Sequence, residues 1–235
     1  MRVGTAGWSI PAAVRDAFPD EGSTLTRYAA VFDTVEINSS SYRPHRAATY
    51  ARWAASVPDA FRFAVKLPRA ATHDLRLVDC DEVLARFQGE MAGLGAKRGP
   101  VLVQLPPSLA FDGATAGRFF DAAARMLGEY IVCEPRHASW FAPEADALFA
   151  AHHVARVAAD PARVPEAALP GGWRGLTYAR WHGSPAIYRS AYEDDALAQH
   201  AGIARAADDS WTFYDNTMFG AAAANALALK ARLDA

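Results

Sequence analysis

Tyr130–His137 reads YIVCEPRH, a short apolar run that ends in charged residues. Near-continuous apolar runs rich in Val, Ile and aromatic residues are typical of strands buried on both faces of a parallel sheet. Seven other stretches of the chain have the same character. They are Arg2–Trp8, Thr34–Arg43, Phe61–Arg69, Pro100–Ser108, Ala155–Pro161, Leu176–Gly183 and Trp211–Thr217.

Most of these runs are separated by stretches with apolar residues at helical spacing. Leu84, Phe87 and Met91 form one such stripe, and residues 116–127 contain another. Eight strands that alternate with helices predict an α/β fold, a single (β/α)8 TIM-like barrel over residues 1–235. The sixth strand-to-helix connection, residues 162–175, is rich in proline and glycine, so we expect it to be irregular rather than a full helix.

Composition narrows the functional classes. The chain has 235 residues, of which 51% are hydrophobic, so it can bury a sizeable core. A formal charge of −2 gives no global attraction to nucleic acid or to an anionic membrane, so any cationic site must be local. Cys80 and Cys133 lack the spacing of a zinc cluster or a disulfide framework. We expect a cytoplasmic protein without a membrane partner, and composition says nothing of the oligomeric state.

The carboxyl ends of the strands are the expected location of the site. In (β/α)8 barrels functional groups lie at that rim, and this chain places its polar residues there. The connections that leave the same rim are long: Ser9–Gly22, Ala70–Cys80 and Ser184–Glu193. Long connections in a compact domain are usually functional, so loops and strand ends indicate the same face.

Two strands carry a carboxylate within an apolar run. Period-two alternation puts Glu134 and Arg136 on one face, where they are either catalytic groups or a buried ion pair that only closes the barrel. Glu36 shares its face with Asn38, and a carboxylate among apolar neighbours needs a partner. We expect Lys66 on the next strand to be that partner.

The last strands add imidazole and carboxylate. Tyr178, Arg180 and His182 share one face, and parity does not decide whether Asp215 or Asn216 points inward on the eighth strand. The candidate catalytic residues are therefore Glu134, Glu36, His182 and Asp215. Glu134, Asp160, His182 and Asp215 are also candidate ligands of a divalent metal such as Mn, Mg, Zn or Fe. The alternative is that they are ordinary strand ends, helix caps or arginine partners.

Basic and aromatic residues complete the predicted rim. Lys66, Arg136 and Arg180 are candidates for binding the phosphate or carboxylate of a small anionic molecule. Aromatic residues at the rim either stack on a ring or base or only pack there. The remaining candidate substrate-binding residues are Asn38, Tyr42, His73, Trp140 and Asn216.

Several motifs resemble those of the YecE-like family, known as domain of unknown function 72. They are VGTAGWS, FDTVEINSSSYR, FRFAVKLPRAATH, GPVLVQLPPSL, CEPRHASW, YARWHG and YDNT, and they cover essentially the whole chain. The resemblance implies a TIM-barrel-like fold and assigns no activity. Ser41 departs from the pattern, since the family more often has Phe there. The matching positions include Gly4, Glu36, Asn38, Tyr42, Lys66, His73, Gln104, Glu134, Arg136, Trp140, Arg180, His182, Asp215 and Asn216.

Three functional classes fit these features. The favoured one is an enzyme that acts on a small anionic metabolite by general acid–base chemistry. The second is a DNA-binding or phosphodiester-cleaving protein similar in architecture to the endonuclease IV barrels, against which the acidic isoelectric point counts. The third is a non-catalytic ligand-binding barrel, and fold alone does not choose among the three.

Overall fold

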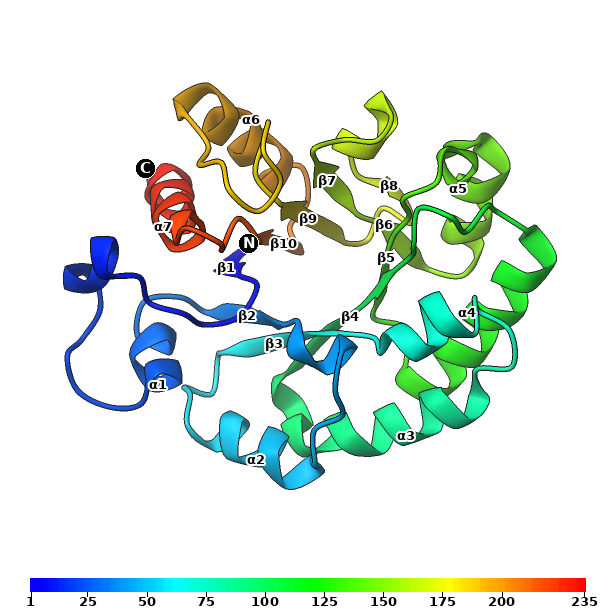
Figure 1. Ribbon diagram of the computed structural model, residues 1–235, viewed down its shortest axis with the longest axis horizontal. Helices are drawn as coiled ribbons and strands as arrows, with labels where there is room; N and C mark the ends of the chain where they lie inside the picture. Colours follow the sequence, from blue (N-terminus) through cyan, green and yellow to red (C-terminus); the bar gives the residue numbers. More distant parts are fainter.

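The computed structural model describes residues 1–235. The strands are β1 (Arg2–Thr5), β2 (Thr34–Ile37), β3 (Arg62–Lys66), β4 (Arg98–Gln104), β5 (Ile131–Glu134), β6 (Val154–Arg156), β7 (Ala158–Asp160), β8 (Gly171–Gly172), β9 (Thr177–Trp181) and β10 (Ser210–Tyr214). The helices are α1 (Thr24–Ala29), α2 (Ala47–Ala55), α3 (Asp81–Met91), α4 (Gly113–Leu127), α5 (Pro143–Ala151), α6 (Asp194–Ala204) and α7 (Ala221–Asp234). Figure 1 shows the helices arranged around the outside of the strands.

The strands form two sheets, with the orders β1-β10-β9-β7 and β2-β3-β4-β5-β6-β8. Every pairing is parallel except that of β6 with β8. The predicted mixed α/β fold with parallel strands is confirmed, but the structure contains no closed eight-stranded sheet. The ladder is interrupted at Val157, which separates β6 from β7, and β1 meets β2 only through one bridge, between Ala6 and Glu36.

The approach of β1 to β2 depends on a glycine. A Cβ atom at Gly4 would lie 2.3 Å from the carbonyl oxygen of Thr34, which is far inside van der Waals contact. Only a residue without a side chain therefore allows the two segments to lie this close.

The predicted runs extend beyond the strands at their carboxyl ends. The polar tail of the second run leaves the sheet, and Ser39–Ser41 form a 3-10 turn. The sixth connection has no α-helix, as predicted; it holds a 3-10 turn at Pro165–Ala168 and the short antiparallel strand β8.

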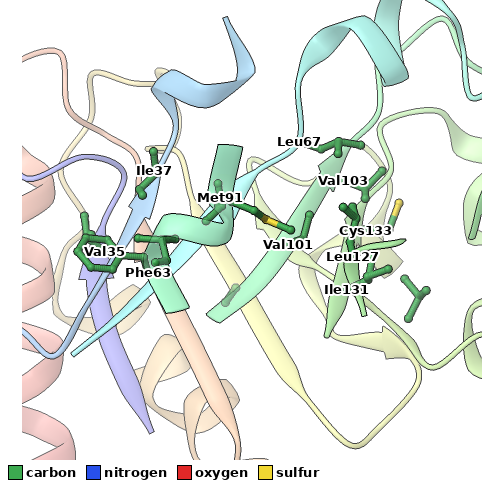
Figure 2. Packing of buried hydrophobic residues seen from close by; sticks show 14 of the residues in the cluster. Val35, Ile37, Phe63, Leu67, Met91, Val101, Val103, Leu127, Ile131 and Cys133 are labelled. Atoms are coloured by element: carbon green, nitrogen blue, oxygen red, sulfur yellow. The ribbon is translucent and has the colours of Figure 1, made fainter. Parts of the chain in front are cut away.

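The outer face of the strands packs against the helices. Alternate residues such as Val101 and Val103 of β4 and Ile131 and Cys133 of β5 belong to a buried cluster of 46 residues (Figure 2). The helices contribute the predicted stripes; Met91 is one example. Burial of apolar surface between these two layers supplies most of the driving force for the fold.

The inner face forms a second, smaller apolar cluster. It contains nine buried residues, among them Ala64, Leu102, Val132, Tyr178 and Phe213. In each of these five strands the residue two positions further along is polar. Since side chains alternate across a strand, those polar residues lie on the same inner face, one layer nearer the carboxyl rim.

Helix α4 illustrates how local sequence sets an element's limits. Asp112 is its N-cap, and its side chain accepts a hydrogen bond of 2.8 Å from the backbone N–H of Thr115. The helix ends at Gly128, which has a φ of 83° that favours glycine.

No α-helix of the protein combines the length and the apolar character that a membrane span requires.

Candidate functional site

A layer of polar side chains lies directly above the inner apolar cluster. Gln104 and Glu134 are the last residues of β4 and β5 and pair with each other in the sheet register. Lys66 is the last residue of β3. Because the carboxyl ends of parallel strands meet at one rim, residues from distant parts of the sequence converge there.

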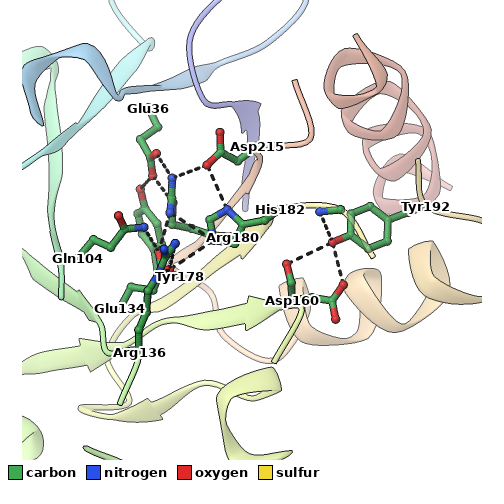
Figure 3. A network of polar contacts seen from close by, with 11 residues as sticks. Glu36, Gln104, Glu134, Arg136, Asp160, Tyr178, Arg180, His182, Tyr192 and Asp215 are labelled. Carbon is green, nitrogen blue, oxygen red and sulfur yellow. Dashed lines mark hydrogen bonds and ion pairs between the residues drawn. The ribbon is translucent and has the colours of Figure 1, made fainter. Parts of the chain in front are cut away.

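Arg180 of β9 is the centre of this layer (Figure 3). Its guanidinium makes a bidentate contact with Glu36, through Nε at 3.0 Å and Nη2 at 2.8 Å. Nη1 donates to Glu134 at 2.6 Å, and Nη2 also donates to Asp215 at 3.0 Å. Nη1 lies 3.3 Å from Nε2 of His182 as well, and the guanidinium is fully buried, so it presents no accessible donor to a ligand.

The partner of Glu36 differs from the prediction. Glu36 pairs with Arg180 and accepts a hydrogen bond of 2.7 Å from the Tyr178 hydroxyl, rather than pairing with Lys66. The planar guanidinium matches both carboxylate oxygens at once, which a point-like ammonium cannot do. Arg180 was predicted to bind substrate, but in this structure it neutralises carboxylates instead.

Glu134 is held between two guanidiniums. Arg136 contacts its Oε1 through Nε and Nη2, both at 2.8 Å, and Gln104 donates to its Oε2 at 3.0 Å. Burial alone would raise the pKa of Glu134, but Arg136 and Arg180 outweigh burial and hold that pKa well below its ordinary value. Glu134 is therefore a carboxylate, not an acid, at neutral pH.

His182 lies between two carboxylates. Its Nδ1 is 3.1 Å from Asp215 and its Nε2 is 3.3 Å from Glu134. Burial and Arg180 both lower the pKa of His182, but the two carboxylates outweigh them and raise it above its ordinary value. Asp215 is thus the residue of the eighth strand's end that points inward, a choice that parity left open.

Lys66 differs from the other charged residues of the site. Only 5% of the surface of Lys66 is exposed, although its Nζ atom is not sealed from solvent. No carboxylate oxygen lies within 4.0 Å of this Nζ. Burial, followed by the neighbouring Arg180, lowers the pKa of Lys66 to about 8, although Glu36, Glu134 and Asp215 act in the opposite direction. The aliphatic part of the Lys66 side chain is therefore buried, and the amine at its end has no ion-pair partner.

Three other predicted residues lie around this amine or at the rim. Tyr42 is 72% exposed, and the centroid of its ring is 5.7 Å from Nζ of Lys66. His73 is half-buried and bonds Thr72, and burial, with Arg69 and Lys66 nearby, lowers its pKa. Asn38 follows β2, and its Oδ1 is sealed from solvent without a hydrogen-bond partner.

Two predicted residues do not join the site. Trp140 is buried in the outer core, where its indole donates to the carbonyl of Leu109 at 2.9 Å and its ring stacks on Phe149. Asn216 donates to Ser190 and Asn225. Both residues follow strands closely, but the chain turns after the strand end and directs these side chains toward the helices and connections.

The four candidate metal ligands do not come together. Asp160 accepts a hydrogen bond of 2.8 Å from Tyr192, apart from the network (Figure 3). Glu134 and Asp215 direct oxygens at Arg180. No group of three or more His, Cys, Asp or Glu side chains is arranged to hold a metal ion. The four candidates are therefore not arranged as a metal site in this structure; Glu134 and Asp215 are arginine partners, which is the alternative that the sequence left open.

A small cleft opens beside Arg136 and His182. Its volume is about 30 Å³, and Pro161, Arg163 and Ile187 form part of its wall. The Nη1 atom of Arg136 has no protein partner, since the contacts to Glu134 use Nε and Nη2. The cleft therefore offers a free guanidinium nitrogen to a small molecule, next to the imidazole of His182, whose two nitrogens face Asp215 and Glu134.

Gln104 and Tyr178 belong to the network but were not among the predicted site residues. Gln104 ends the fourth apolar run, and Tyr178 is two positions before Arg180 on the same face. Gln104 would have been found by treating the polar end of every strand as a candidate. Tyr178 would have been found by period-two alternation, because it shares a face with Arg180.

Comparison with known proteins agrees with the resemblance seen in the motifs. The model of a family described as "Protein of unknown function DUF72" matches residues 2–235. UPF0759 protein YecE of Escherichia coli strain K12 is 30% identical over 142 residues, which is 60% of this chain and 50% of that protein. The match thus spans about half the length of that relative.

Solved structures share the fold. A DUF72 family protein from Enterococcus faecalis V583 has a TM-score of 0.82 at 20% identity, covering 100% of this chain and 95% of the other. One from Thermotoga maritima MSB8 has a TM-score of 0.80 at 24% identity, covering 100% and 99%. Since the family model extends over nearly the whole chain, this protein belongs to the DUF72 family.

Proposed function

We propose that this protein is an enzyme that acts on a small anionic metabolite, phosphorylated or carboxylated, by general acid–base chemistry at the carboxyl rim. The observation that carries the proposal is the presence of two cations with unused donors at one rim, Lys66 and Arg136, of which Arg136 lines a cleft with the doubly paired His182. Perturbed titratable groups gathered at a cleft are typical of catalytic sites.

Charge balance supports an anionic ligand. The carboxylates of Glu36, Glu134 and Asp215 face Arg180, Arg136 and, when it is protonated, His182. Three negative groups and three positive groups balance, so the ammonium of Lys66 is a charge in excess. A ligand that brings a negative charge to Lys66 and to Nη1 of Arg136 would neutralise it.

Proton transfer would belong to His182. Its position between Glu134 and Asp215 raises its pKa above the ordinary value, which favours the imidazolium form that can donate a proton and recover it. Glu134 and Asp215 would set the pKa and orientation of the ring, and Glu36 would act through Arg180 by holding the guanidinium in place. These carboxylates are positioning residues in this proposal.

Binding would require a movement of the covering connection. A cleft of about 30 Å³ has room for only one or two water molecules. Ile187 in the wall belongs to the long Ser184–Glu193 connection, and the ring of Tyr188 lies edge-on to His182 with centroids 5.8 Å apart. Displacing this segment outward would open the site to a metabolite.

Thermal unfolding with added anions tests the proposal. Inorganic phosphate and glucose 6-phosphate should raise the melting temperature, since a ligand that binds only the folded state stabilises it by mass action. Lys66→Met should remove most of that effect, whereas Lys230→Met, a change at an exposed helical lysine, should keep it. Equal stabilisation by glucose, or none by any anion, would contradict the proposal.

The same thermal-unfolding assay distinguishes the anionic-metabolite enzyme from a nucleic-acid-binding protein. Single-stranded DNA that stabilises the protein more than phosphate does, with a steep salt dependence, would favour that class. The burial of Trp140 and Trp181 removes two aromatic residues that a base could have stacked on.

A further inference from the structure

Lys66 stands apart from the other lysines of the chain. Lys97 donates to the carbonyls of Ala54 and Val57 at 2.9 and 2.7 Å, and Lys230 pairs with Asp234 at 3.3 Å. The Nζ of Lys66 has no hydrogen-bond or ion-pair partner in the protein, although the rest of the side chain is buried. No hydrogen bond or ion pair within the protein therefore accounts for this amine, which meets only solvent and the ring of Tyr42.

We propose that Lys66 is a nucleophile, and that its amine forms a Schiff base with the carbonyl carbon of an aldehyde or ketone that also bears an anionic group. The location of the site and the anionic group rest on the proposed function. The Schiff base itself rests on the unpaired, solvent-accessible Nζ at the carboxyl end of β3 and on its place at the same rim as Gln104 and Glu134, the last residues of β4 and β5.

The reaction balances with the groups at hand. The lone pair of the neutral amine forms a bond to the carbonyl carbon, the carbonyl π pair moves to oxygen, and a proton passes from nitrogen to that oxygen. The resulting carbinolamine hydroxyl takes a proton from an acid of the site, the role proposed above for His182, and leaves as water. The nitrogen lone pair then closes the C=N bond, which gives a protonated imine and no redox change.

The surroundings of Lys66 favour both the neutral amine that attacks the carbonyl and the cationic imine that forms. Burial and the charge of Arg180 lower the pKa of Lys66, so that about a quarter of the amine is neutral at pH 7.5, against about one part in a thousand for an ordinary lysine. The positive charge that develops on the imine nitrogen lies within the field of Glu36, Glu134 and Asp215. Lysines activated in this way are typical Schiff-base nucleophiles.

An anion anchor alone is a weaker explanation. Arginine keeps its charge at any physiological pH and binds phosphate with two donors, and Arg136 already offers a free Nη1 at this rim. A desolvated lysine loses part of its charge, which makes it a poorer anchor but a better nucleophile.

Reductive trapping tests the proposal on the intact chain. Dihydroxyacetone phosphate and, in parallel, dihydroxyacetone would be incubated with the protein and sodium cyanoborohydride at pH 7.5, and adducts at the three lysines counted by peptide mass spectrometry. We expect Lys66 to be labelled at least about tenfold more than Lys97 and Lys230, because more of its amine is neutral. The phosphorylated probe should label Lys66 faster than the neutral one, and inorganic phosphate should slow it. In Lys66→Arg, checked for folding by its melting temperature, the preferential adduct should disappear.

The outcomes distinguish the two proposals. Labelling of Lys66 no greater than that of Lys97, with phosphate still raising the melting temperature, would overturn the Schiff base and leave the anionic-substrate site standing. If both probes labelled Lys66 preferentially and to the same extent, with no effect of phosphate, the result would support Lys66 as a nucleophile and overturn the proposal of an anionic substrate. A uniform low yield at all three lysines and no phosphate effect would overturn both.

Discussion

Replacing Lys66 with methionine should stabilise the folded protein at neutral pH. Methionine has a similar length and fills the buried part of the site, but it carries no charge to be removed from water. The wild-type amine is buried, lacks an ion-pair partner and is surrounded by a polar network that is already balanced. The protein therefore holds this lysine at a cost in stability.

The size of the effect follows from the pKa. Lowering the pKa of Lys66 from 10.5 to about 8 corresponds to roughly 3 kcal/mol against the charged amine in the folded state. Solvent contact at Nζ reduces this, so we expect about 1–3 kcal/mol of stabilisation in Lys66→Met. For a chain of this length that is a rise in melting temperature on the order of 5 °C.

The difference should depend on pH with a definite sign. A base whose pKa is lower in the folded state binds fewer protons there, so wild-type stability rises with pH between the folded and unfolded pKa values. The advantage of Lys66→Met should be complete below pH 8 and shrink as pH rises from about 8 toward 10.5.

Chemical denaturation in phosphate-free buffer at pH 6.5, 8 and 9.5 measures this directly. Lys97→Met is the matched control, since it loses hydrogen bonds to Ala54 and Val57 and should destabilise the protein at every pH. If Lys66→Met destabilised the protein, or if its effect were the same from pH 6.5 to 9.5, the unpaired-amine account would be wrong.

Three further changes test other parts of the structure. Arg180→Met should cost about 3–5 kcal/mol by denaturant titration, because it leaves buried carboxylates without their counter-charge; a loss below about 1 kcal/mol would contradict the central role of this arginine. Asp215→Asn should lower the pKa of His182 followed by NMR, and an unchanged titration would show that the contact does not set that pKa. Gly4→Ala should lower the melting temperature sharply, since its Cβ would clash with Thr34, and a neutral effect would refute the close packing of β1 on β2.

The sequence was sufficient to predict the alternation of elements and the rim at which the charged side chains meet. Apolar runs such as residues 100–108 identified the strands because both faces of the sheets are covered. Period two grouped Glu134 with Arg136, and Arg180 with His182, on one face of each strand, but it did not say which face is the inner one. The convergence of Glu36, Glu134, Arg180, His182 and Asp215 follows from strand ends that share one rim.

The pairing within the site could not be predicted in the same way. Which carboxylate meets which cation depends on sheet closure and on side-chain reach across the interior, and those are tertiary properties. The sequence suggested Lys66 as the ion-pair partner of Glu36 because their strands are neighbours. In the structure Arg180 extends between the two sheets and forms ion pairs with three carboxylates at once. The break at Val157 was likewise invisible, since an apolar residue at that position is compatible with a continuous strand.

The most direct test of the account is the pKa of Lys66 itself, followed by NMR of the labelled lysine side chains. The chain has three lysines, so the spectrum is simple, and Lys66→Arg assigns the signal. We predict a pKa of about 8 in the free protein, from burial beside Arg180, and an upward shift when inorganic phosphate is added. A value near 10.5 that phosphate does not change would show that Lys66 is an ordinary surface-like amine, and the proposed site would then have no excess charge for an anion and no nucleophile.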